Sequence, residues 1–143
     1  IYWLSDTVMN VPPSLRKWFI FHFITDIAFA VPLFFAPEAF LSFWGFTTFN
    51  NLTARLTGAA LAGIGVNSLL MSAKGIESYS SMLSLKIVWS VSAIAGIVIT
   101  IAEGGPFSLY IFLSIFSVFS LVWIYYKRVV LKIIKAVPLQ PQP

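Results

Sequence analysis

Long apolar segments separated by short polar breaks run through most of the chain. Four of these segments approach the length of about 20 residues that a helix needs to cross a bilayer core of about 30 Å at about 1.5 Å per residue. The pattern therefore predicts four transmembrane helices, at residues 18–35, 52–72, 81–102 and 107–126.

Proline and glycine mark the ends of the predicted spans. Pro12 and Pro13 precede the first span as a helix-start signal, and Pro32 and Pro37 predict a kink or a stop at its far end. The sequence Gly104-Gly105-Pro106 predicts a tight turn between the third and fourth spans.

Two further segments are too short or too polar to cross the membrane. Residues 38–49 are rich in Phe and Trp but are interrupted by Ser, Gly and Thr, which favours a short interfacial segment between the first two spans. The basic extension 127–143 keeps apolar residues around Lys132 and Lys135, so the last helix can continue beyond the membrane until Pro138. Residues 139–143 have the composition of a disordered tail.

Composition agrees with a membrane protein. Hydrophobic residues make up 59% of the 143 positions and charged residues only 10%, against about 25% charged in an ordinary soluble domain. We therefore predict an all-α, polytopic four-helix bundle that forms a single transmembrane domain over residues 1–143. The first ten residues lack the basic flank and cleavage site of a signal peptide, and we interpret this terminus as processed or incomplete.

The basic residues are distributed unevenly about the predicted spans. Four crossings place both termini and the second loop on one side, which collects every basic residue except Arg55: Arg16, Lys17, Lys74, Lys86, Lys127, Arg128, Lys132 and Lys135. The positive-inside rule predicts that this side is cytoplasmic. Because the net charge of +4 flanks apolar segments, lipid headgroups are favoured as its partner over nucleic acid.

Four polar residues inside the spans form a candidate ligand- or proton-binding layer. His22 and Asp26 are four residues apart and share one helix face. Asn67 and Lys86 lie at a similar depth in the second and third spans, about 6–8 Å from the cytoplasmic boundary at about 1.5 Å per residue. Ionisable groups within a membrane are functional candidates because their desolvation is unfavourable.

This layer has two interpretations. In one, Asp26 holds a proton or cation that His22 relays. In the other, which we favour, Asp26 is paired with His22 or Lys86, Lys86 extends toward the headgroups, and Asn67 joins two helices through hydrogen bonds.

No catalytic, metal-binding or cofactor-binding motif accompanies the layer. The chain has no cysteine and a single histidine, which excludes thiolate chemistry and bis-histidine haem ligation. Ser114, Ser117 and Ser120 recur every three residues on the fourth span, but no base lies near them in the pattern, so we assign them to helix packing.

Small residues predict where helices pack closely. The second span carries them at four-residue spacing in two rows: Ala54, Gly58 and Ala62 in one, and Ala59 and Gly63 in the other. We expect this helix to lie at the centre of the bundle. The neighbouring Arg55 is a candidate membrane anchor, a ligand for an anionic lipid head, or an ion-pair partner of Glu38 or Glu103.

Two segments resemble a known group of membrane proteins. The sequence Phe35-Ala36-Pro37-Glu38-Ala39-Phe40 with Gly45, followed by the segment Ala54-Arg55-Leu56-Thr57-Gly58-Ala59-Ala60-Leu61, is similar to the small four-helix proteins of the DoxX-like group. The resemblance covers the first two spans and the four-span layout. It implies that architecture, in a group that includes members associated with redox or quinone-linked complexes.

The sequence is compatible with three functions. We favour a non-enzymatic accessory or assembly subunit of a larger membrane complex, or of a homo-oligomer, because packing seams are present and a catalytic set is not. The alternatives are a small transporter or ligand-binding bundle that uses the polar layer, and a subunit of a quinone-linked oxidoreductase.

Overall fold

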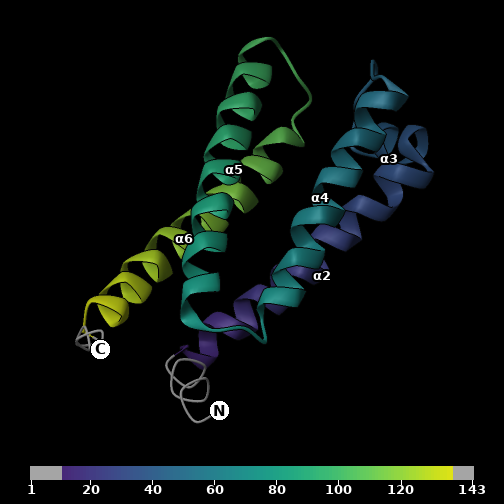
Figure 1. Ribbon diagram of the computed structural model, residues 1–143. Helices are drawn as coiled ribbons and strands as arrows, with labels where there is room; N and C mark the ends of the chain where they lie inside the picture. Colours follow the sequence, from purple (N-terminus) through teal and green to yellow (C-terminus); the bar gives the residue numbers. More distant parts are fainter. Residues whose placement is uncertain (1–10, 137–143) are drawn as a thin grey trace.

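The computed structural model describes residues 11–136 and is built from helices (Figure 1). Their order is α2 (Pro13–Phe35), α3 (Pro37–Phe43), α4 (Asn51–Met71), α5 (Ile76–Ala102) and α6 (Leu109–Ala136). Within the described residues there is no strand, and α2, α4, α5 and α6 are long and apolar enough to cross a membrane. The predicted all-α, four-span architecture is thus confirmed, and the chain is a multi-pass integral membrane protein.

The helix ends follow from local chemistry. Pro13 stands at the start of α2, where its missing N–H would have had no partner in the helix. Pro32 does not end α2, which continues to Phe35. The side chain of Asn50 caps α4 by accepting a hydrogen bond from the Thr53 N–H at 3.1 Å.

The segment between the first two spans is a short helix followed by a turn. Of residues 38–49, the first part lies in α3, and the chain then turns at Gly45, whose φ of 84° favours glycine. As the pattern around Lys132 and Lys135 predicted, the last helix continues beyond the end of the span at residue 126, and α6 extends to Ala136. The predicted tail 139–143 and the N-terminal interpretation lie outside the described residues.

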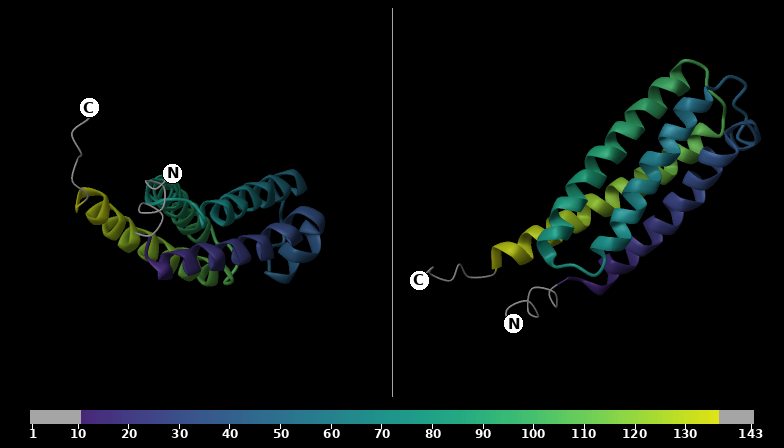
Figure 2. Two further views of the ribbon diagram at one scale, coloured as in Figure 1. Left: turned by 60° about the horizontal axis from the view of Figure 1, so that its bottom comes forward. Right: turned by 45° about the vertical axis from the view of Figure 1, so that its right-hand side comes forward.

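The four long helices form two pairs. α2 packs against α4 along its length and α5 packs against α6, whereas α4 and α5 have little contact. Figures 1 and 2 show that the pairs meet near the end where α2 begins and α6 ends, and that they diverge toward the end that carries α3. We call these the closed end and the open end of the bundle.

Aromatic and aliphatic side chains fill the closed end. Phe19, Tyr79 and Trp123 are almost fully buried there, and they belong to α2, α5 and α6 respectively. The Phe19 ring centroid lies 4.5 Å from that of Tyr79 and 5.8 Å from that of Trp123. This core, with Leu15, Leu83 and Val130, joins the two helix pairs.

Glycine allows α2 and α4 to approach each other closely. A Cβ added to Gly58 would lie 2.9 Å from the Ala30 carbonyl oxygen, and one added to Gly65 would lie 2.8 Å from the Cβ of Asp26. The face of α4 toward α2 thus carries small residues at its contact points. The expected central position of this helix is not observed, because its small residues bring it close to one neighbour only.

The two predicted rows of small residues have different environments. Ala54 and Gly58 lie on the face of α4 that packs against α2, and Ala62 is half-buried beside them. Ala59 and Gly63 are exposed, and nothing lies within 4 Å of a Cβ added to Gly63.

Gly58 and Gly63 offer a matched pair of substitutions in one helix. We expect Gly58→Ala to lower the free energy of unfolding by about 1–3 kcal/mol, because the new methyl group meets the α2 backbone. Gly63→Ala is expected to leave it unchanged or raise it by up to about 1 kcal/mol through helix propensity. Unfolding in mixed detergent micelles, followed by circular dichroism, measures both, and equal destabilisation by the two variants would contradict the proposed packing.

Candidate functional site

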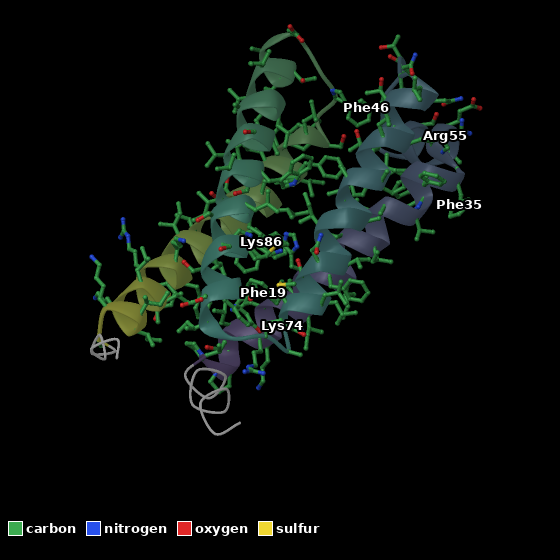
Figure 3. All side chains as sticks on the ribbon, in the orientation of Figure 1. Phe19, Phe35, Phe46, Arg55, Lys74 and Lys86 are labelled. Atoms are coloured by element: carbon green, nitrogen blue, oxygen red, sulfur yellow. The ribbon has the colours of Figure 1, made fainter. Side chains whose placement is uncertain are left out.

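A buried lysine of α5 is the centre of the candidate site. Lys86 lies on the inward face of its helix with Met82, Leu83 and Ser90, and only 1% of its surface is exposed. Its side chain points from α5 toward the other helix pair (Figure 3), so the predicted extension of Lys86 toward the headgroups is wrong. A cation in this position needs hydrogen-bond acceptors from neighbouring helices, because lipid and apolar side chains supply none.

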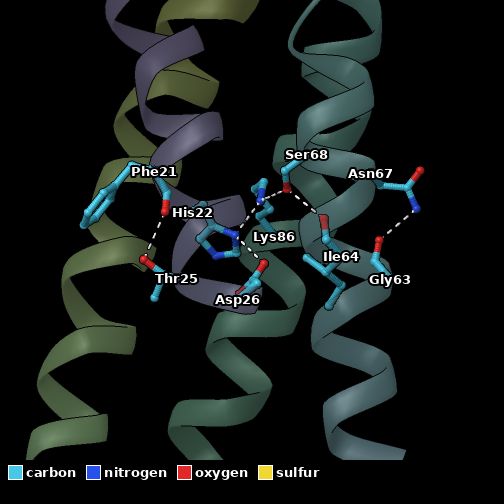
Figure 4. Close-up of polar contacts among 9 residues, drawn as sticks. All are labelled: Phe21, His22, Thr25, Asp26, Gly63, Ile64, Asn67, Ser68 and Lys86. Carbon is cyan, nitrogen blue, oxygen red and sulfur yellow. Dashed lines mark hydrogen bonds and ion pairs between the residues drawn. The ribbon is translucent and has the colours of Figure 1, made fainter. Parts of the chain in front are cut away.

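α2 and α4 supply two of these acceptors (Figure 4). The Nζ atom of Lys86 lies 2.6 Å from the Ser68 Oγ of α4 and 3.0 Å from the His22 Nδ1 of α2. Ser68 in turn donates its hydroxyl proton to the Ile64 carbonyl oxygen at 2.7 Å. Lys86 thereby joins three helices that belong to both pairs.

His22 is also in contact with a carboxylate. Its Nδ1 lies 2.7 Å from the Asp26 Oδ2, one turn further along α2. This distance permits an ion pair, but the contact lacks hydrogen-bond geometry, and Oδ2 is buried without a hydrogen-bond partner. The sequence-predicted pairing of His22 and Asp26 on one helix face is thus present as a close contact.

One imidazole nitrogen therefore faces both an ammonium group and a carboxylate. When Nδ1 is unprotonated it can accept a hydrogen bond from Lys86, and when the imidazole is protonated on both nitrogens it can form an ion pair with Asp26, but it cannot do both. The position of one proton thus selects between two arrangements of the same three side chains. This is the feature of the cluster that could support proton binding.

Aromatic rings cover the cluster. The Lys86 Nζ lies 5.0 Å from the ring centroid of Phe19 and 4.9 Å from that of Trp123, which are cation–π distances. The His22 ring contacts Phe119 at a centroid distance of 4.7 Å. Because no cluster member is more than 7% exposed, the opposite charges of Lys86 and Asp26 balance each other away from bulk water.

Asn67 does not join the other three predicted residues. It is exposed on α4, and its amide nitrogen donates to the Gly63 carbonyl oxygen at 3.1 Å on its own helix. The neighbouring Ser68 occupies the inward position instead. The sequence does contain a signal for Ser68. Its spacing from Gly58, Leu61 and Gly65 places it on the same helical stripe as these three buried residues.

Other basic residues join helix ends rather than the cluster. Arg16 donates to the Ser72 carbonyl oxygen at 3.3 Å, and Lys127 donates to the carbonyl and hydroxyl oxygens of Ser80 at 2.7 and 2.8 Å. These contacts stabilise the closed end.

Arg55 bonds to α2, whereas Ser114 of the serine stripe bonds within its own helix. The Nε of Arg55 donates to the Phe34 carbonyl oxygen at 3.3 Å, whereas Glu38 accepts a hydrogen bond from Asn51 at 2.9 Å. Ser114 donates to the Tyr110 carbonyl oxygen of its own helix, and Ser120 is buried. Within residues 11–136, no three His, Asp or Glu side chains gather in a way that could hold a metal ion.

Comparison with protein-family models, with curated proteins and with solved structures finds no match to this chain. The resemblance to the DoxX-like group remains a prediction from the sequence.

The coupling within the cluster can be measured by a double-mutant cycle. Lys86→Met is expected to lower the free energy of unfolding by about 3–5 kcal/mol, because it leaves the Asp26 charge buried without its counter-ion. Adding Asp26→Asn should recover about 1–3 kcal/mol of that loss. Lys132→Met on the exposed face of α6 is the control and should have little effect, and strictly additive losses at positions 26 and 86 would argue against coupling.

Proposed function

We propose that this protein is a non-enzymatic accessory subunit that packs against another membrane-protein helix through the outward face of α4. The observation that carries the proposal is the division of polar groups between the two faces of this helix. Ser68 is used within the bundle, whereas Asn67 remains exposed on a stretch that spans the membrane.

The outward face has the chemistry of a helix-packing surface. Ala59, Gly63 and Asn67 follow one another at four-residue spacing and therefore line one side of α4. Small residues permit close backbone approach in lipid, and an amide group there is stabilised by a partner that forms hydrogen bonds with it. We define Ala59, Gly63 and Asn67 as the outward seam.

A groove beside this seam adds polar groups. It lies between α4 and α5, has a volume of about 420 Å³, and is lined by Asn67, Met71, Ser78, Ser81, Met82 and Leu85. Because α4 and α5 have little contact, side chains of a partner can reach both helices here. The partner is a larger membrane protein or a second copy of this chain.

The orientation of the bundle follows from its charge distribution. The closed end carries Arg16, Lys17, Lys74 and Lys127, whereas Arg55 lies toward the open end. The positive-inside rule supports a cytoplasmic closed end, with both termini on that side.

Substitution of the outward seam tests the accessory role. Purification in a mild detergent is expected to recover the wild-type chain with a stoichiometric partner, and Gly63→Leu is expected to lose that partner because the larger side chain blocks close approach. Gly96→Leu on α5 is the matched control, because nothing lies within 4 Å of a Cβ added at either glycine. A wild-type chain that purifies as a lone stable monomer would contradict the proposal.

A second candidate function rests on the shared contact at His22 Nδ1. Because one proton position selects between Asp26 and Lys86 as its neighbour, the cluster could couple proton or cation binding to transport. Asp26→Asn is then expected to abolish proton-coupled uptake into proteoliposomes while the amount of inserted protein stays normal. Lys132→Met serves as a control, and uptake that persists unchanged in Asp26→Asn would exclude this candidate.

A further inference from the structure

A cavity at the open end lies apart from the polar cluster. Its volume is about 350 Å³, within the range of small-molecule sites. α2, α3, α4, α6 and the turn after α3 contribute its lining: Phe29, Leu33, Phe40, Leu41, Trp44, Phe46, Phe49, Asn50, Thr53, Ala54, Thr57, Leu61 and Phe112. We call it the outer cavity.

The walls of the outer cavity select an uncharged ligand. Phe29, Phe40, Trp44 and Phe112 form a connected set of rings, in which the Trp44 and Phe112 centroids are 4.9 Å apart and those of Phe29 and Phe40 are 5.9 Å apart. No lining residue is charged. A charged group would lose its hydration there without gaining a counter-ion.

The shape of the outer cavity selects an elongated ligand. Along α4 its lining extends from Asn50 to Leu61, which corresponds to about 16 Å at about 1.5 Å per residue. The polar members Asn50, Thr53 and Thr57 occupy the outer part of this stretch, and deeper positions are apolar. A ligand with a polar end near the membrane surface and an apolar chain along the helix matches this gradient.

One residue of the lining has a buried polar atom that does not reach the cavity. The indole Nε1 of Trp44 is shielded from solvent and forms no hydrogen bond within the described part of the chain. Because this donor is inaccessible, the interior of the outer cavity offers its ligand almost no polar group. The Trp44 carbonyl oxygen accepts a hydrogen bond from the Ser108 hydroxyl, which fixes the turn against the start of α6.

We propose that the outer cavity binds one acyl chain of a membrane lipid. The chain lies along α4 with its end near Leu61 and Phe29. The polar rim of Asn50 and Thr53 faces the glycerol region. This proposal does not depend on the accessory role, because the outward seam lies elsewhere on α4.

Photolabelling tests the proposal on the full chain in nanodiscs. The probe is a phosphatidylcholine with a diazirine near the end of one acyl chain, and peptide mapping locates the label. The label is expected to concentrate on the deep lining residues of the cavity. Thr57→Phe, which fills the cavity, should abolish this label, whereas Leu56→Phe on the lipid-facing side should retain it.

Trp44→Phe keeps the ring and removes the indole N–H. It is expected to retain the label, because the indole nitrogen is not accessible from the cavity, while unfolding of the protein remains close to that of the wild type. Label spread evenly over lipid-facing residues, and unchanged in Thr57→Phe, would overturn the proposal.

Discussion

The burial of the Lys86 ammonium group is the constraint on which the arrangement of the helices depends. A charge at this depth is tolerated only with acceptors and a counter-charge close by, and no single helix provides them all. His22 and Asp26 come from α2 and Ser68 from α4, while Phe19 of α2 and Trp123 of α6 cover the group. The need to surround the Lys86 ammonium group with acceptors, a counter-charge and aromatic rings thereby fixes the relative positions of all four long helices.

Close packing of α2 on α4 makes that arrangement possible. Gly65 lies directly against Asp26, and a Cβ at this position would meet the Asp26 side chain. Because Ser68 is three residues further along the same stripe, the absence of a side chain at Gly65 brings the Ser68 hydroxyl within reach of Lys86. The close packing of α4 on α2 at Gly65 and the charge cluster are thus parts of one structural solution.

The two ends of the bundle differ in how they use aromatic residues. At the closed end the rings fill the space between the helix pairs and exclude water from the cluster. At the open end α3 and the turn at Gly45 hold Trp44 and Phe46 beside the gap, and the rings line a cavity. The same residue types therefore produce a sealed core at one end and a proposed lipid site at the other.

The sequence by itself determined the four spans, the breaks between them, and the placement of His22 and Asp26 on one face of the first helix. Segment length and Pro and Gly positions predicted the four long helices, and four-residue spacing predicted the contact of His22 with Asp26. Depth along the helices also placed Lys86 beside them.

Only the tertiary structure decided that Ser68, and not Asn67, faces the cluster, and that Ala59 and Gly63 face outward. The physical reason is that lipid and protein interior are both apolar, so the pattern along a spanning helix does not specify its rotation. That rotation is set by close contacts such as Gly65 against Asp26, which exist only once the helices have packed.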